Sequence, residues 1–339
     1  MGKRSGRTVG VGIIGCGGIA RGKHLPELEP VREMRLVACA DLIAKRAREV
    51  ARRGGASLVT DDYHELLACD EVDAVIVSTP HPSHGDIGID VLKARKHLLV
   101  QKPMTTTVRD ADRLLRAARR SRKVALALPY LYGPWLCKIA DLLERGAVGT
   151  VRMARCRVAH DADHKASSWF TQKDAAHGGA LFDMGVYAAA LLVDLLGRAT
   201  AISGMFTAPT GGATAEQNVG MTLRFACGAI GVLETSWQEI GYRDRLTIYG
   251  STGTLDCPAG EIHLATKPTR KGGKVRWKRV PPSKRIPMPQ NVCRHWADCI
   301  SRGRKPLIPI SRGRHLVEIL CAGYQAAATG REAAIRSNV

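Results

Sequence analysis

The sequence predicts an α/β protein with an N-terminal, doubly wound parallel sheet and a second, α+β domain whose large open sheet is mostly antiparallel. Strand and helix patterns alternate over residues 9–128, which is typical of parallel sheets. A glycine-rich turn follows the first apolar run, and the alternation stops at Pro129. The length of 339 residues fits two domains of about 150 residues each. We therefore expect one domain over 1–130 and a second over 131–339.

The first turn carries a phosphate-binding pattern. An apolar run is followed by GCGGIA at 15–20, which has the spacing G-x-G-x-x-A. In this pattern Gly15 permits a tight turn, and Gly17 lets the backbone approach a pyrophosphate. Gly18 and Ile19 complete the loop at the start of a helix, whose N-terminus favours an anion. The turn therefore predicts a dinucleotide-binding domain of the Rossmann type.

The end of the second strand predicts the cofactor. This strand, over 35–40, ends in Asp41, 21 residues after Ala20. A carboxylate at this position can accept hydrogen bonds from both ribose hydroxyls and repels a 2′-phosphate. We therefore expect NAD, and NADP stays open because Lys45 and Arg46 lie one helical turn further on.

The remaining N-terminal elements follow in order. The acids at 61–62 can cap a short helix. The prolines within 78–84 exclude a helix there, so Ser83 is expected to cap the next one. The expected helices cover 44–53, 63–68, 83–95 and 107–120, and the expected strands cover 73–79, 97–101 and 124–128.

The second half of the chain reads mainly as strands. A helix over 135–145 precedes a strand over 151–159, and a polar segment over 161–177 leads into an apolar helix over 188–196. Few helices separate the later strands, so we expect them to pair mostly antiparallel. These strands cover 201–208, 218–225, 229–238, 245–250 and 253–256, and closing helices cover 293–302 and 312–328.

Composition limits the possible partners and surroundings. The net charge is +20, but the one dense basic run, 267–285, holds a single aromatic residue. We expect a solvated hairpin there and no specific nucleic-acid site, because single-strand binders use a series of stacking aromatics. The ten cysteines show no paired spacing, which predicts free thiols, a cytoplasmic protein and no metal site. No apolar run approaches the roughly 20 residues of a membrane span, and the basic N-terminus leads directly into the glycine turn, so we expect neither a membrane segment nor a signal peptide.

Four motifs, in this order, resemble the glucose–fructose oxidoreductase/inositol dehydrogenase (Gfo/Idh/MocA) family. They are GCGGIA at 15–20, the loop STPHPSH at 78–84, QKP at 101–103 and GGALFDMGVY at 178–187. The resemblance covers nearly the whole chain. It implies a Rossmann domain that binds NAD or NADP, followed by an α/β domain that supplies substrate contacts and subunit interfaces. It also implies cofactor contacts from Thr79, Pro80, His84, Gln101 and Lys102, with His84 at the nicotinamide end.

Two motif positions depart from the family pattern. Gln101 replaces the glutamate of the usual E-K-P, and Tyr187 replaces the usual catalytic histidine, although glucose–fructose oxidoreductase-like and dimeric dihydrodiol dehydrogenase-like relatives also carry tyrosine there. Oxidation of an alcohol by a nicotinamide requires a base for the hydroxyl proton. Tyrosine has an ordinary pKa of about 10 and needs a nearby cation for this task. We expect Lys102 as that cation, Tyr187 as the acid/base, and Asp183, four residues earlier on the same helical face, as a ligand of a substrate hydroxyl.

Two residues of the polar segment have open roles. Trp169 either forms a wall on which a sugar stacks or packs internally. His177 directly precedes the Gly-Gly turn, where it either contacts substrate as an alternative acid/base or is polar surface.

The predicted activity is hydride transfer between NAD(P) and a secondary hydroxyl or carbonyl of a sugar, a polyol or a related cyclic compound. Three alternatives remain: a redox-neutral, glycoside-cleaving enzyme that holds NAD⁺ tightly; a relative acting on a trans-dihydrodiol or an imine; and a non-enzymatic regulator that senses a dinucleotide or a sugar. The sequence does not name the substrate, because specificity resides in loops. A homodimer or homotetramer is expected, because the second sheet has few helices to cover both of its faces.

Overall fold

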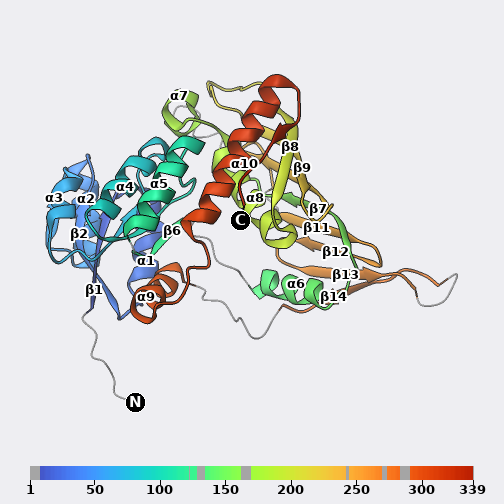
Figure 1. Ribbon diagram of the computed structural model, residues 1–339, viewed down its shortest axis with the longest axis horizontal. Coiled ribbons are helices and arrows are strands. Elements are labelled where there is room, and N and C mark those ends of the chain that lie inside the picture. Colours follow the sequence, from blue (N-terminus) through green and yellow to red (C-terminus); the bar gives the residue numbers. More distant parts are fainter. Residues whose placement is uncertain are drawn as a thin grey trace, which may run out of the picture. The chain divides into compact units, whose positions relative to one another are not determined.

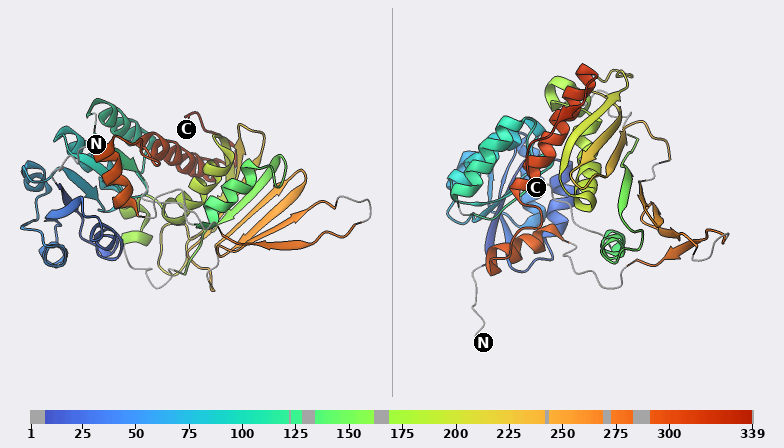
Figure 2. Two further views of the ribbon diagram at one scale, coloured as in Figure 1. Left: turned by 90° about the horizontal axis from the view of Figure 1, so that it is seen from below. Right: turned by 45° about the vertical axis from the view of Figure 1, so that its right-hand side comes forward.

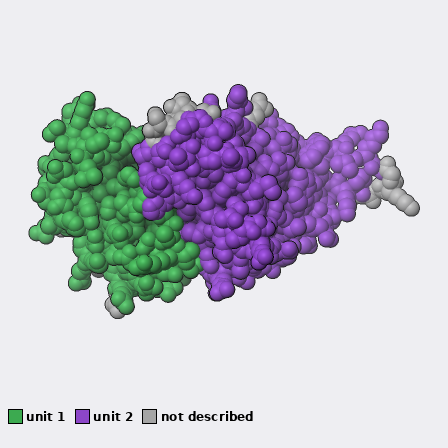
Figure 3. Space-filling model, turned by 90° about the horizontal axis from the view of Figure 1, so that it is seen from above, with its two compact units in different colours: residues 1–131, 289–314 green, residues 132–288, 315–339 purple. Residues whose placement is uncertain are grey.

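A computed structural model describes residues 8–121, 123–127, 134–161, 169–241, 244–268, 273–282 and 291–338. The chain forms two units, Met1–Leu131 with Pro289–Arg314, and Tyr132–Met288 with His315–Val339 (Figures 1 and 3). The expected boundary at Pro129 lies outside the described residues. The expected division into 1–130 and 131–339 differs from these units, because the segment Pro289–Arg314 belongs to the first one.

Burial explains why this late segment returns to the first unit. Helix α9, Val292–Arg302, buries Trp296 completely, in the same core as Val11 and Leu25 of the N-terminal elements. The side chain of Asn291 caps α9 by accepting from Arg294 N at 2.9 Å. Burial of so large an apolar side chain is favourable, so it stabilises the packing of α9 on the first unit although α9 is far from the N-terminal elements in sequence.

The sheet of the first unit is parallel throughout, as expected. Its strand order is β3-β2-β1-β4-β5-β6, and every neighbouring pair is parallel. All four residues of β4 are buried, which is why the strand reads as a continuous apolar run. The strands are β1 (Val9–Ile14), β2 (Met34–Ala40), β3 (Leu58–Thr60), β4 (Ala74–Val77), β5 (His97–Val100) and β6 (Ala125–Ala127).

The helices of this unit agree with expectation except around two turns. The glycine turn leads into a π-helical segment, η1 (Ala20–His24), and then into the short α1 (Leu25–Leu28). The expectation that Ser83 caps α4 was wrong. Residues His81–Ser83 form a 3-10 helix, so Ser83 has helical geometry and its hydroxyl donates back to Pro80 O at 2.7 Å. The other helices are α2 (Ala44–Gly54), α3 (Tyr63–Ala68, capped by Asp62), α4 (His84–Lys93) and α5 (Val108–Ser121).

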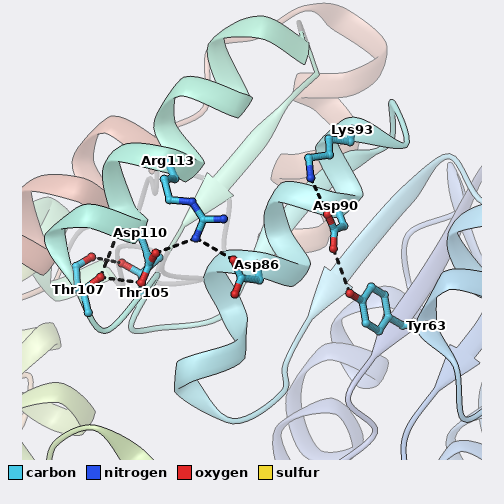
Figure 4. A network of polar contacts seen from close by, with 8 residues as sticks. All are labelled: Tyr63, Asp86, Asp90, Lys93, Thr105, Thr107, Asp110 and Arg113. Carbon is cyan, nitrogen blue, oxygen red and sulfur yellow. Dashed lines mark hydrogen bonds and ion pairs between the residues drawn. The ribbon is translucent and has the colours of Figure 1, made fainter.

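Polar contacts join α3, α4 and α5 on the surface of the first unit (Figure 4). Arg113 Nη1 of α5 lies 2.9 Å from Asp86 Oδ1 of α4 and 2.9 Å from Asp110 Oδ1. Tyr63 of α3 donates its hydroxyl to Asp90 Oδ2 of α4 at 3.0 Å. Exposed pairs of this kind contribute at most about 1 kcal/mol each, so they support the packing and do not determine it.

The second unit contains a nine-stranded mixed sheet, as expected. The strand order is β14-β13-β12-β11-β7-β10-β9-β8-β15, and only the β7–β10 pair is parallel among the described strands. Alternation along β9 buries every second residue, which fixes one inner and one outer face. The strands are β7 (Val151–Arg157), β8 (Ala199–Phe206), β9 (Asn218–Phe225), β10 (Ile230–Ser236), β11 (Arg245–Gly250), β12 (Gly253–Pro258), β13 (Ile262–Thr266), β14 (Trp277–Val280) and β15 (Ala333–Ala334).

Strands β13 and β15 were not among the expected strands, and β15 has only two residues. Strand β14 lies within the basic run and pairs antiparallel with β13, which precedes the run, so the described part of the run belongs to a hairpin, as expected. All residues of β14 are at least partly exposed, so it lacks the buried-and-exposed alternation that marks a strand in sequence.

The helices of the second unit include the one that carries the candidate catalytic residues. Helix α8, Val186–Leu196, continues a π-helical segment η5, Leu181–Gly185, so helical structure begins well before the expected residue 188. It packs on β7 and β10 (Figure 2). The others are α6 (Pro134–Glu144), η4 (Trp169–Thr171), α7 (Lys173–Ala176) and α10 (Ile310–Thr329), of which the last begins within Pro289–Arg314.

Two expectations from composition can be compared with the fold. The segment Lys173–Leu196 has the length and hydropathy of a membrane span, contrary to the expectation that no segment would, but 78% of its apolar 18-residue window is buried inside the structure, as in the core helix of a globular unit. All ten cysteines are free, as expected. Burial raises the pKa of several thiols, to about 12 for Cys293 and about 11 for Cys299, so these groups stay protonated near neutral pH.

Candidate active site

The carboxyl ends of four parallel strands meet at one edge of the first unit's sheet. Ile14, the last residue of β1, pairs with Ala40 of β2 on one side and with Val77 of β4 on the other. Val77 in turn pairs with Val100, the last residue of β5. The chain runs from β1 through β2 to β3, then crosses to β4 on the other side of β1. Doubly wound sheets bind ligands at such a switch point, so the loops that follow these four strands define the candidate cofactor site.

The glycine turn has the geometry that a dinucleotide requires. Gly15 has φ of 87°, its N–H donates to Ala40 O at 2.8 Å, and an added Cβ would lie 2.7 Å from the carbonyl of Ser78. Only glycine fits this position. By contrast, a Cβ added to Gly17 or Gly18 would meet no heavy atom within 4 Å, and Ile19 beside them is 49% exposed. This stretch therefore presents open backbone, which is what the approach of a pyrophosphate needs.

Asp41 joins the glycine turn to the end of β2. Its Oδ2 accepts from Cys16 N at 2.7 Å, and its Oδ1 accepts from Ile43 N at 2.8 Å. Each carboxylate oxygen can accept a further hydrogen bond, so the contact with a ribose that the sequence predicts is compatible with this geometry. The carboxylate also orders the turn, a role that the sequence did not indicate.

The loop after β4 holds Thr79 and Pro80 at the sheet edge but withdraws His84. Pro80 is exposed and Thr79 is half-buried, in keeping with their expected place at the cofactor. The His84 ring is 1% exposed, with Nδ1 2.8 Å from Pro103 O and Nε2 2.7 Å from Thr79 O. The ring is thus enclosed and engaged on both sides, and its place at the nicotinamide end stays a prediction. It joins the loops after β4 and β5.

Burial determines the protonation state of His84. Burial lowers the pKa of His84 most strongly, the two carbonyl contacts oppose this, and the charge of Lys102 lowers it further. A neutral imidazole has a single N–H, so it donates to only one of the two carbonyls. The net direction of the pKa shift is downward, so we assign a neutral ring to His84.

Gln101 and Lys102 follow β5 at the same edge, and Lys102 precedes Pro103 through a cis peptide bond. Gln101 is buried, and its Oε1 accepts from Lys102 N at 2.8 Å. Its Nε2 lies 3.0 Å from Nε2 of His24, a fully buried residue of η1. Burial lowers the pKa of His24 to about 3, so its Nε2 accepts from the amide. Gln101 thus supports the backbone of Lys102, a role that the sequence did not indicate, and its contact with the cofactor stays a prediction.

In the second unit, Asp183 is held by a tryptophan. Asp183 lies in η5 and is 5% exposed, and its Oδ2 accepts from Trp237 Nε1 at 3.0 Å. Trp237 is itself 1% exposed and packs on Phe170, with ring centroids 4.7 Å apart. The indole therefore fixes the orientation of a nearly buried carboxylate.

Tyr187 stands at the start of α8 and is half-buried. The same-face argument for Asp183 and Tyr187 assumed an α-helical period from one to the other. The structure instead places Asp183 in a π-helical turn, which has more residues per turn, so the two side chains are offset differently from an α-helical i, i+4 pair.

The two open residues of the polar segment are both exposed. Trp169 is 44% exposed and meets Phe170 edge to face, at a centroid distance of 5.9 Å, so an aromatic series runs from Trp169 through Phe170 to Trp237. His177 ends α7 with φ of 58° and is exposed.

The candidate catalytic residues belong to both units, Lys102 to the first and Asp183 and Tyr187 to the second. No group of three or more His, Cys, Asp or Glu side chains among the described residues is placed to hold a metal ion. No pattern in the sequence pointed to His24 or Trp237, since each acts through a partner more than 50 positions away.

Comparisons with known proteins identify the family of both parts of the chain. Residues 9–128 match the oxidoreductase family with an NAD-binding Rossmann fold, and residues 137–256 match the GFO/IDH/MocA C-terminal domain. The chain is 34% identical over 178 residues to the dTDP-3,4-didehydro-2,6-dideoxy-alpha-D-glucose 3-reductase of Actinomadura kijaniata. This match covers 52% of this chain and 53% of that protein, so it spans about half of the relative's length. It is 28% identical over 256 residues to the inositol 2-dehydrogenase of Rubrobacter xylanophilus, which covers 74% of this chain and 71% of that protein. Among solved structures, GenD2 from gentamicin A biosynthesis in complex with NAD is 26% identical, with a TM-score of 0.82 and 99% of each chain covered.

Proposed function

The chain belongs to the Gfo/Idh/MocA family of NAD-binding oxidoreductases, and on that basis we propose that it transfers a hydride between nicotinamide and a secondary hydroxyl or carbonyl of a sugar, a polyol or a related cyclic compound. Its relatives include a reductase of a dTDP-linked sugar and a dehydrogenase of inositol, which supports this substrate class. The observation that carries the proposal is the glycine turn, whose open backbone at Gly17 and Gly18 lies beside Asp41 at the switch point of the sheet.

The residues of the first unit fit NAD. The turn at 15–20 would hold the pyrophosphate, and Asp41 would accept from the ribose and disfavour a 2′-phosphate. Thr79 and Pro80 would face the cofactor from the loop after β4. The nicotinamide, when bound, supplies the acceptor or donor of hydride.

The protein's own task is to handle the proton and orient the substrate. Tyr187 would take the proton from the reacting hydroxyl, or return it in the reverse direction, and Lys102 would stabilise the phenolate as a neighbouring cation. Asp183, already oriented by Trp237, would accept a hydrogen bond from a second hydroxyl of the substrate. Trp169 would provide an apolar wall for a sugar ring.

The test is a panel of sugars, polyols, a glycoside, a trans-dihydrodiol and a cyclic imine, followed with both cofactors at the NADH absorbance and, for the glycoside, by the release of free sugar. Turnover of a sugar or polyol with NAD supports the proposal. Cleavage of a glycoside without net NADH identifies the redox-neutral alternative, and turnover of the dihydrodiol or imine alone assigns that class instead. Tight NAD binding without any turnover favours a sensor.

The catalytic pair has its own test. Lys102→Ala and Tyr187→Phe should each lower kcat by about 10²- to 10⁴-fold, the usual worth of acid–base help, with NAD affinity nearly unchanged. Because the two groups act together, the double variant should lose far less than the product of the single losses. Tyr187→His should keep partial activity with a pH profile shifted to lower pH. Normal turnover by Tyr187→Phe would show that the hydroxyl takes no part, and His177 would become the residue to test.

We also propose a homodimer or homotetramer in the cytoplasm, without specific nucleic-acid binding. Every second residue of β9 and β10 is at least partly exposed, which supports an interface on the sheet face opposite α8. A monomer by light scattering at micromolar concentration would contradict this, as would a sequence-specific nucleic-acid complex that survives physiological salt.

A further inference from the structure

The start of the helix that carries Asp183 and Tyr187 is bound by a residue from elsewhere in the second unit. Helical structure begins at Ala180, so the first backbone N–H groups have no partner within the helix. Glu216, two residues before β9, supplies partners for three of the N–H groups at this start. Its backbone oxygen accepts from Ala180 N at 2.9 Å, and its Oε1 accepts from Leu181 N at 3.0 Å and from Gly179 N at 3.1 Å.

Tyr324 of α10 completes this arrangement. Its hydroxyl donates to Glu216 Oε1 at 2.5 Å and also lies 2.9 Å from Gly179 N as an acceptor. Its ring stacks on Phe182 of η5, with centroids 5.3 Å apart and planes 22° apart. Glu216 is 6% exposed, so the carboxylate makes these contacts in a largely dry setting, where each contributes more than it would in water.

The two glycines before the helix, Gly178 and Gly179, leave room for this contact, and a larger side chain at either position would not. An added Cβ on Gly179 would collide with the backbone oxygen of Glu216, and one on Gly178 would collide with Tyr324 and Phe182. Gly178 also has φ of 157°, which other residues rarely adopt. The Gly-Gly pair thus lets Glu216 and Tyr324 approach the backbone directly.

We propose that Glu216 and Tyr324 are positioning residues for the reaction: they anchor the start of the η5–α8 helix and thereby set the place of Asp183 and Tyr187. A carboxylate at a helix N-terminus is favoured by the helix dipole as well as by its hydrogen bonds. Neither residue needs to touch the substrate. This inference rests on the proposed function, because it assumes that Asp183 and Tyr187 act on substrate.

The test compares Glu216→Ala, Glu216→Gln and Tyr324→Phe with the wild type. Glu216→Ala should lower kcat by roughly 100-fold, since a displacement of about 1 Å at reacting groups has that effect, with the Kd for NAD unchanged. Glu216→Gln should recover part of the loss, because an amide oxygen still accepts from Leu181 N. Tyr324→Phe keeps the ring stacked on Phe182 and should lower kcat by about 10-fold. Hydrogen exchange of the amides over 179–187 should rise in all three.

Glu318→Gln is the matched control. Glu318 also accepts from two backbone N–H groups in the second unit, those of Arg336 and Ser337 at 2.9 Å each, but it holds the C-terminal segment. This variant should leave kcat and the exchange of 179–187 unchanged.

The outcomes separate this inference from the proposed function. Faster exchange at 179–187 with kcat per folded molecule unchanged would overturn the positioning role and leave the oxidoreductase proposal standing. If Glu216→Ala does not fold, Tyr324→Phe provides the same two measurements and distinguishes the same two outcomes. A wild type that turns over no substrate in the panel would refute the proposed function, and the positioning role would fall with it.

Discussion

Replacing Asp41 by asparagine tests the residue that joins the glycine turn to the end of β2 in the candidate cofactor site. The two carboxylate oxygens accept from two different segments, Cys16 N in the glycine turn and Ile43 N after β2. Asparagine has one acceptor oxygen, so its amide group would face one of these N–H donors. One hydrogen bond to a charged group is thereby lost, and such bonds contribute about 1.5–3 kcal/mol.

This loss should appear as weaker NAD binding. If the turn must be reordered when the cofactor binds, 1.5–3 kcal/mol corresponds to a roughly 10-fold to 150-fold higher Kd for NAD. The Kd for NADP should rise less, because the same substitution removes the charge that repels a 2′-phosphate. Isothermal titration with both cofactors measures the two changes and their ratio.

Asp73→Asn is the control for this experiment. Asp73 Oδ2 accepts from Gly10 N at 2.9 Å at the opposite edge of the same sheet, where β1 and β4 begin. It should lower stability and leave both cofactor affinities unchanged. An Asp41→Asn variant with NAD affinity within twofold of the wild type and an unchanged NADP ratio would refute the reasoning, since Asp41 would then neither order the turn nor contact the ribose.

Two further predictions concern buried groups. Trp237→Phe removes the indole N–H that donates to Asp183 Oδ2 and keeps an aromatic ring against Phe170. It should lower the free energy of unfolding by about 1.5–3 kcal/mol and reduce kcat without changing the Kd for NAD. An unchanged kcat would show that the indole does not orient the carboxylate. Burial lowers the pKa of His24 from 6.5 to about 3, so as the pH falls below 6.5 the unfolded chain binds a proton that the folded chain does not bind until about pH 3, and stability is lost across this window. Between pH 6.5 and 5 the wild type should lose about 2 kcal/mol more than His24→Asn in urea unfolding, and parallel curves would contradict the neutral assignment of His24.

Features that depend on neighbouring residues could be predicted from the sequence alone. The glycine turn, the alternation of strand and helix over 9–127 except for β3, and the strands Asn218–Phe225 and Arg245–Gly250 were predicted, because local geometry and burial on a sheet leave a periodic pattern in the chain. The position of Gly15 was also predictable, since only glycine adopts its φ of 87° without strain.

Which polar groups meet depends instead on the packing of distant segments. The burial of His84, the contact of Gln101 with His24, and the binding of the η5–α8 helix start by Glu216 and Tyr324 join residues 19 to 145 positions apart. Such contacts leave no periodic pattern in the sequence, because each joins a single pair of polar groups. Which two groups meet is determined only when the strands and helices have packed. The same reason explains the place of α9. This helix belongs to the first unit because Trp296 is buried in that unit's core, although α9 lies near the end of the chain.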